Sequence, residues 1–215
     1  MSEATMTFTP PLAPEDRMRA DLYGLFARLF LAAPDADLLR AIGAATGEAS
    51  GEASGNGGEA PPVATAWSKL AAASRAMDPG AAADEFDALF GGVGHSAISL
   101  FGSHYMQQEA AAEPLLVSLR AALAELGLGR QMGINLPEDH LAAVFESMRL
   151  LISGGPDVQP KDLAMQRFFF MRFVGAWVPR CGNAILMNAV ANYYKAVAEC
   201  LLHFISIEDE SLAIE

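Results

Sequence analysis

The chain has few basic residues, few cysteines and no long apolar run, and each shortage excludes a class of protein. Its 215 residues include 14 Lys and Arg against 26 Asp and Glu, which gives a net charge of -12. A surface this acidic repels phosphate backbones and anionic lipid, so we expect neither nucleic acid nor a membrane surface as a partner. It would attract a cationic partner instead.

No stretch reaches the ~18 uninterrupted apolar residues that are typical of a membrane span. The most apolar segment, FFFMRFVGAWV, is interrupted by Arg172. The N-terminal sequence MSEATMTFTPPLAPEDR carries acids and prolines where a signal peptide has basic residues followed by an apolar stretch. We therefore expect a cytoplasmic protein without stable membrane insertion.

The two cysteines, Cys181 and Cys200, do not indicate a disulfide framework. Both fall in one predicted helix over residues 181–206, where a rise of ~1.5 Å per residue would separate them by roughly 28 Å. Because that distance is too long for a disulfide, we expect no structural bridge between them.

The residues that are abundant predict helix. Apolar residues make up 52% of the chain and charged residues 19%, as in a folded globular protein. Ala and Leu dominate, helical spacing recurs in segment after segment, and no run of β-branched residues alternates as a strand would. We predict an all-α, single-domain bundle of about eight to ten helices over residues 1–215. Residues 1–13 are predicted as a flexible N-terminus and 46–61 as a Gly/Ser/Glu-rich surface loop.

An acid beside an imidazole, Asp139 and His140, stands at the mouth of the apolar helix in NLPEDHLAAVFESMRLL. Such a pair can serve catalysis, hold a metal, cap a helix or contact a partner. Pro137 suits the first helical position, Glu138 and Asp139 would complement the helix dipole in the first turn, and Asn135 or its neighbour could provide the cap. His140 is harder to explain structurally, because a side chain that can become a cation is disfavoured at a helix N-terminus.

The pattern gives little support to chemistry at this pair. A zinc protease helix would need a second histidine four residues after His140, where Val144 stands instead. The remaining histidines show no ligand spacing, and no Gly-x-Ser-x-Gly elbow is present. We therefore predict no metal site, no catalytic residues, no cofactor and no enzyme. A weak GTP-binding protein using the glycine-rich segment Gly91–His95 stays an alternative, although no strand precedes the segment and no Gly-Lys-Ser/Thr follows it.

Binding is the activity that remains. Phe86, Leu89 and Phe90 fall on one helical face, beside the acid Asp87. Such a face most often packs in a core. Apolar residues rimmed with acid would also suit a peptide that is both hydrophobic and basic. The face leads into residues 91–107, which show no clear period and are predicted as a long ordered loop of the kind that often carries function.

Four stretches, in order and spanning nearly the whole chain, resemble the TorD/DmsD family of cytoplasmic chaperones for molybdenum-containing redox enzymes, which includes a NarJ-like branch. They are YGLFARLFLAAPDADLL, FDALFGG, LPEDHLAAVFESMRLLI and FFFMRFVGAWVPRCGNAILMNAVANYYKAVAECLLHFI. The resemblance implies an all-helical, non-catalytic molecular chaperone. Such a chaperone binds the twin-arginine signal peptide or the apo form of a molybdoenzyme subunit, assists cofactor insertion and holds its client back from export until it is mature.

The resemblance, together with the acid-rimmed face, also indicates which residues bind the basic and apolar signal peptide. The family usually has a Pro-Pro pair before the loop aromatic, and this chain has Ser99 and Leu100 there. An assembly factor for a non-exported respiratory or redox enzyme subunit is an alternative, and long helices joined by a flexible hinge permit a homodimer by domain swapping. The predicted peptide-binding residues are Tyr23, Phe86, Asp87, Leu89, Phe90, Phe101, Ser103, Tyr105, Asp139 and His140.

Overall fold

The computed structural model describes residues 12–45, 62–91, 96–106, 114–129, 136–156 and 158–214. Over these ranges the chain forms helices joined by turns, with two isolated bridges and no strand, around one hydrophobic core. The predicted all-α class and single domain are confirmed. The predicted flexible N-terminus, except for its last two residues, and the predicted 46–61 loop lie outside the described residues.

Several helix boundaries follow local capping signals. Asp35, Asp78 and Asp162 each accept a backbone N–H at the start of a helix, which stabilises that helix by about 1 kcal/mol. Gly127 follows a helix C-terminus with a φ of 75°, a conformation that glycine adopts without strain. The elements are α1 (Pro14–Leu31), α2 (Ala36–Ala44), α3 (Pro62–Ala76), α4 (Pro79–Phe90), α5 (Gly102–Met106), α6 (Leu115–Glu125), α7 (Leu141–Ser153), α8 (Leu163–Phe170), the π-helical turn η1 (Met171–Gly175), α9 (Val178–Met187) and α10 (Tyr193–Ala213).

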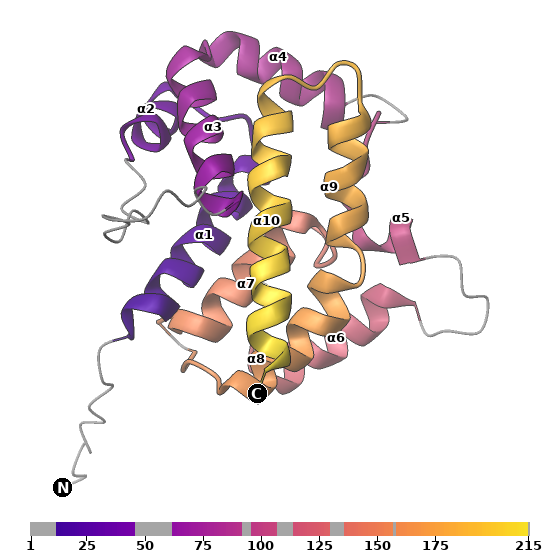
Figure 1. Cartoon of the computed structure of the whole chain (residues 1–215). Helices are drawn as coiled ribbons and strands as arrows, with labels where there is room; N and C mark the ends of the chain where they lie inside the picture. The colour runs from indigo at the N-terminus through magenta and orange to yellow at the C-terminus, as the bar shows by residue number, and fades with distance from the viewer. Residues whose placement is uncertain are drawn as a thin grey trace, which may run out of the picture.

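The long helix α10 runs through the middle of the bundle (Figure 1). Helices α3 and α9 pack along it, α2 packs on α3, and α1 makes its main contact with α7. The short helix α5 lies to one side of α9, and α4 crosses the end of the bundle where α10 begins (Figure 1). None of the helices formed by the described residues combines the length and the hydropathy required of a membrane span.

An aromatic cluster joins α1, α7 and α10. Tyr23 and Phe26 of α1 lie against Phe145 of α7 and Phe204 of α10, with ring centroids 4.9 to 6.2 Å apart. All four side chains are buried, and each contributes about 1.5–3 kcal/mol of apolar burial. The core therefore sits where the helices from both ends of the described chain meet.

The predicted single helix over 181–206 is wrong, because α9 and α10 are separate. The Asn188 side chain accepts the Val190 N–H over 2.9 Å and turns the chain between them. Cys181 and Cys200 consequently lie on different helices, and both are buried free thiols. The separation expected from one continuous helix does not apply to them.

Part of the predicted 91–107 loop is helical. Residues 102–106 form α5, and residues 92–95 lie outside the described part of the chain. Farther along, the predicted helix around FFFMRFVGAWV forms α8 and then the π-helical turn η1. Single π-helical turns of this kind occur frequently at functional sites. Just after this turn, the Trp177 indole N–H donates to the Phe173 carbonyl oxygen over 2.7 Å.

Candidate functional site

The Asp-His pair lies where the segment leading into α5 crosses the start of α7. We call these two segments, residues 98–106 and 136–142, the loop–α7 junction. Phe101 and His140 face each other across it as an isolated antiparallel bridge. The junction therefore joins parts of the chain that the sequence pattern left unconnected.

Backbone hydrogen bonds hold the junction together. The Gly102 N–H donates to the Asp139 carbonyl oxygen over 2.8 Å, and the Leu141 N–H donates to the Leu100 carbonyl oxygen over 2.8 Å. Gly102 also has no room for a side chain, because a Cβ there would lie 2.6 Å from Leu115 and 2.9 Å from Trp177. The loop is fixed by these close approaches.

Asp139 fastens the loop with its side chain as well. The residue is 3% exposed, and its Oδ2 accepts the Ser103 N–H over 3.0 Å. Asp139 thus accepts hydrogen bonds from the first two backbone amides of α5. Its carbonyl oxygen accepts one and its carboxylate accepts the other. A buried carboxylate without such donors would be costly, so the amides of α5 and the charge of Asp139 stabilise each other.

His140, and not the acids before it, caps α7. The predicted first turn is wrong: Pro137 and Glu138 precede the helix, which begins at Leu141. The Nδ1 atom of His140 accepts the Ala142 N–H over 3.2 Å. Asn135, the predicted cap, lies outside the described residues.

The protonation state of His140 explains how a histidine can occupy this position. Burial lowers its pKa to about 4, although the negative charge of Asp139 opposes the shift. The imidazole is therefore neutral near pH 7 and can accept a hydrogen bond as an N-cap. Its ring meets the edge of the Phe101 ring, with centroids 5.1 Å apart. The neutral ring supports the aromatic beside it and fixes its position.

Acidification should destabilise the fold through His140. A histidine in the unfolded chain titrates at about pH 6.5, so between that pH and about 4 the unfolded state binds a proton that the folded state excludes. We expect this residue to lower the free energy of unfolding by about 2 kcal/mol between pH ~7 and ~4.5. Urea titrations at both pH values should show a weaker pH dependence in His140→Asn, which keeps a capping acceptor but does not titrate. The exposed His104→Asn is the matched control, and equal pH dependence in all three proteins would contradict the assignment.

Tyr105 ties the loop to α9. Its hydroxyl donates to the Ser99 carbonyl oxygen over 2.9 Å, and its ring stacks on Trp177 with centroids 5.7 Å apart. The Cys181 thiol donates to the same Ser99 oxygen over 3.6 Å. Hydrogen bonds to the carbonyl oxygens of Ser99 and Leu100 therefore hold this part of the loop. Sequence reasoning missed Ser99 and Trp177 as supports, because no local pattern connects them.

The predicted apolar face of α4 packs mainly into the core. Leu89 is fully buried, while Phe86 and Phe90 are half-buried and meet the Tyr194 ring edge-on or tilted. Asp87 is exposed on the same helix. The end of this face meets the loop–α7 junction, where the Leu89 carbonyl oxygen accepts the Ile98 N–H over 2.9 Å.

Tyr23 lies in the core between α1, α7 and α10 and not at the loop–α7 junction. None of its surface is exposed, and its hydroxyl donates to Glu208 over 3.0 Å. In this structure Tyr23 and Leu89 present no surface to a peptide. The junction brings together the other half of the predicted set: Phe101, Ser103, Tyr105, Asp139 and His140.

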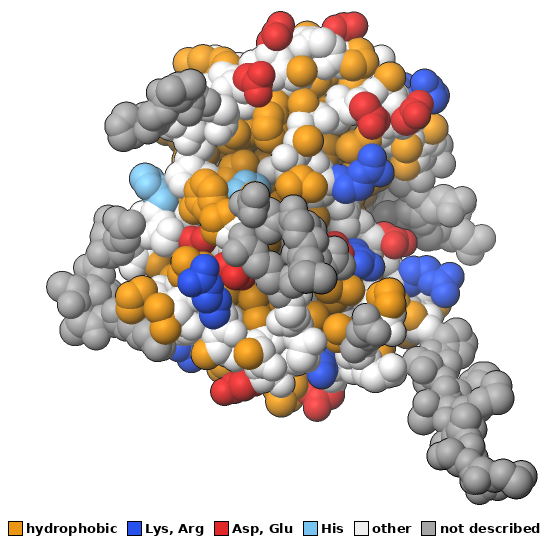
Figure 2. All heavy atoms as spheres, turned by 180° about the vertical axis from the view of Figure 1, so that it is seen from behind, with side chains coloured by type: hydrophobic (Ala, Val, Ile, Leu, Met, Phe, Trp, Pro, Cys, Tyr) orange, Lys and Arg blue, Asp and Glu red, His pale blue; other side chains and the backbone are white. Residues whose placement is uncertain are grey.

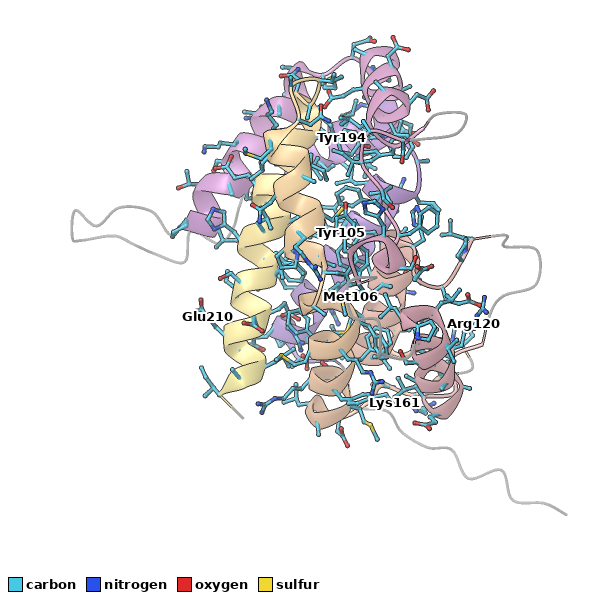
Figure 3. All side chains as sticks on the ribbon, turned by 90° about the vertical axis from the view of Figure 1, so that its right-hand side faces the viewer. Tyr105, Met106, Arg120, Lys161, Tyr194 and Glu210 are labelled. Atoms are coloured by element: carbon cyan, nitrogen blue, oxygen red, sulfur yellow. The ribbon has the colours of Figure 1, made fainter. Side chains whose placement is uncertain are left out.

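The outer side of the junction is partly apolar. Phe101 is 37% exposed, and Met106 at the end of α5 is similarly exposed beside Arg180 of α9. Figure 3 places Tyr105 and Met106 next to each other on this side of the molecule. Seen from behind, hydrophobic side chains lie beside histidine and acidic ones on the surface (Figure 2). The junction therefore has partly exposed apolar side chains, Phe101 and Met106, at its surface.

The arrangement offers little for proton transfer or metal binding. His140 uses one ring nitrogen as a helix cap, and the Asp139 carboxylate is engaged by a backbone amide. Across the described ranges, no group of three or more His, Cys, Asp or Glu is placed to hold a metal ion. What the junction presents is a loop held by hydrogen bonds, with the partly exposed aromatic side chain of Phe101 on it.

Comparison with known proteins places the chain in a family. The profile described as "Nitrate reductase delta subunit" matches residues 56–183, which is more than half of the chain and runs from before α3 into α9. The matched region contains the whole loop–α7 junction. No curated protein is significantly similar to the chain. The chain therefore belongs to the nitrate reductase delta subunit family, whose members are chaperones for the maturation of molybdenum-containing enzymes.

Proposed function

We propose that the protein is a cytoplasmic chaperone that binds the twin-arginine signal peptide, the apo form, or both, of a molybdoenzyme subunit. By holding the client it would assist cofactor insertion and delay export until the enzyme is mature, as in the TorD/DmsD chaperones. One observation carries the proposal. Phe101 is partly exposed on a loop that is held in place by contacts with Asp139 and His140.

A fixed aromatic is a good anchor for an apolar helix. Because the loop is already ordered, binding does not have to supply the entropy of ordering it. The net charge of -12 would attract the arginines of a leader, and exposed carboxylates such as Asp87 could pair with them bidentately. Phe101 and Met106 would contact the apolar part of the leader, while Asp139 and His140 hold the platform in place.

Replacing Phe101 by alanine should weaken leader binding about tenfold or more, because a central aromatic anchor contributes on the order of 2 kcal/mol. The probe is a synthetic peptide with two adjacent arginines followed by a helical apolar stretch, titrated by calorimetry. Val117→Ala, which truncates another exposed apolar residue on α6, is the matched control. A peptide with two lysines in place of the arginines should bind more weakly, because lysine cannot pair bidentately.

If the wild type, Phe101→Ala and Val117→Ala bound the arginine peptide with equal affinity, the junction would not be part of the peptide-binding site. The family match supports equally a second candidate, an assembly factor for a redox enzyme subunit, which we propose for a client that is not exported. In that case the chain would bind the folded or apo body of the client and show no preference for the arginine peptide over the lysine peptide. Titration with the client subunit, with and without its first residues, separates the two functions.

A further inference from the structure

A second apolar surface runs along the outer side of α8 into η1. We call it the α8 strip, and it consists of large apolar side chains that are each 41 to 51% exposed: Leu163, Met165, Phe168 and Met171. The other side of the same helix is covered, since Phe169 and Phe170 are fully buried. Exposed apolar side chains that follow one another in this way commonly mark a contact surface in soluble proteins.

Two arginines flank the α8 strip. The Arg172 guanidinium lies 5.9 Å from the centroid of the Phe168 ring, so it borders the strip on that side. Arg167 is exposed and directly precedes Phe168. With about 100° between successive residues of a helix, Phe168 and Met171 fall between the two arginines around the helix axis. The strip is therefore an apolar line with a positive charge on each side.

No carboxylate of its own segment balances these charges. Residues 163–198 contain no Asp or Glu, although the chain has 26 acidic residues. Asp162, just before α8, is used as the helix cap and accepts the Met165 N–H over 2.9 Å. Among the ion pairs formed by the described residues, none involves Arg167 or Arg172. The α8 strip is thus a basic and apolar surface on a chain whose net charge is -12.

We propose that the α8 strip docks an acidic amphipathic helix of a partner protein. Such a helix carries apolar side chains along one face and Asp or Glu on both sides of them. The apolar face covers Phe168 and Met171, and the carboxylates pair with Arg167 on one side and Arg172 on the other. Charges that flank an apolar seam determine which helices pair, and arginine binds carboxylates bidentately. The methionines of the strip adapt their shape to the partner's side chains.

The charges of the α8 strip favour this partner over other occupants. A basic leader would bring its arginines against Arg167 and Arg172, and the strips of two copies would repel each other for the same reason. Anionic lipid would meet these two arginines but also the net negative charge of the chain, which repels it.

The α8 strip is also separate from the loop–α7 junction. Figure 3 shows Lys161, which directly precedes the cap of α8, well apart from Tyr105 and Met106 of the junction. The proposal therefore does not depend on the proposed function.

Calorimetric titration of the whole protein with two synthetic peptides tests the proposal. Both peptides have leucines at the spacing of one helical face, flanked by glutamates in one peptide and by lysines in the other. The wild type should bind the glutamate peptide at least about tenfold more tightly than the lysine peptide, because only glutamates pair with the arginines.

Arg167→Glu and Arg172→Glu should each weaken binding of the glutamate peptide about tenfold. The double variant should prefer the lysine peptide, a gain that loss of folding cannot produce. Phe168→Ala should weaken binding of the glutamate peptide about tenfold as well, because it removes the central aromatic contact. Arg40→Glu, the same charge reversal on α2, should bind the glutamate peptide like the wild type.

Three results would overturn the proposal. The wild type could bind neither peptide or both equally, the charge variants could bind the glutamate peptide as tightly as the wild type, or the double variant could fail to favour the lysine peptide. Flotation with phosphatidylglycerol vesicles that the double variant loses would assign the α8 strip to a membrane surface instead. A dimer in sedimentation velocity that the double variant lacks would assign it to a second copy of the chain.

Discussion

Replacing Glu208 by alanine should lower the free energy of unfolding by about 4 kcal/mol, the cost expected when one partner of a buried ion pair is removed. Glu208 is 2% exposed on α10. Its carboxylate accepts two hydrogen bonds from the Arg19 guanidinium, at 2.7 and 3.0 Å, and a third from the Tyr23 hydroxyl at 3.0 Å. Alanine would leave the guanidinium largely buried beside a new cavity, with Asp16 as its remaining partner.

Urea unfolding at neutral pH measures this loss. Glu208→Gln is the informative control, because it keeps the volume and one acceptor while removing the charge, and it should cost less than alanine. The exposed neighbour Glu210→Ala should change the stability by less than about 0.5 kcal/mol. If Glu208→Ala proved as stable as Glu210→Ala, the ion pair would have no net role in holding α1 against α10.

Replacing Glu85 by alanine should lower the free energy of unfolding by about 3 kcal/mol, because the Glu85 carboxylate caps the start of α10. Glu85 itself lies on α4. It accepts the backbone N–H groups of Asn192, Tyr193 and Tyr194, at 2.7, 3.0 and 2.9 Å. Hydrogen bonds to a charged group are worth about 1.5–3 kcal/mol each, and water can replace part of that at the exposed Asn192. The negative charge also complements the dipole of α10.

Two measurements separate this cap from a general packing effect. Urea unfolding should find Glu85→Gln between the wild type and Glu85→Ala, because an amide oxygen accepts but carries no charge. Hydrogen exchange in Glu85→Ala should accelerate first at the amides of residues 192–194. Asp87 lies exposed on the same helix as Glu85. Asp87→Ala should therefore leave the free energy of unfolding and the exchange of these amides unchanged. Uniform acceleration across α10 would contradict a local capping role.

Local signals predicted most of the helices, whereas long-range contacts decided the rest. Apolar periodicity and capping aspartates such as Asp35 act within a few residues, so they can be read directly from the sequence. The break between α9 and α10 was missed because the cap of α10 comes from Glu85, which lies 107 residues before Asn192 in the chain. The mixed α8–η1 segment was missed because apolar spacing does not distinguish an α-turn from a π-turn.

The candidate site was predicted in part, for similar reasons. The Asp139–His140 pair attracted attention because a histidine is unusual at a helix N-terminus, and burial resolves the difficulty by keeping the ring neutral. The partner of Asp139, the amide of Ser103, lies 36 residues away and gave no local signal. Spacing identified the apolar face of α4 correctly but could not tell which side of it would be covered by Tyr194.

The attachment of α10 at both ends has a consequence for how the protein is made. Its first turn is held by a carboxylate of α4, and its last turns hold an arginine of α1. During synthesis the segments of α1 and α4 leave the ribosome long before α10 does, so neither contact can form until the segment of α10 has emerged. The bundle can therefore close only after the segment of α10 has emerged, and until then the aromatic core that joins α1, α7 and α10 stays incomplete.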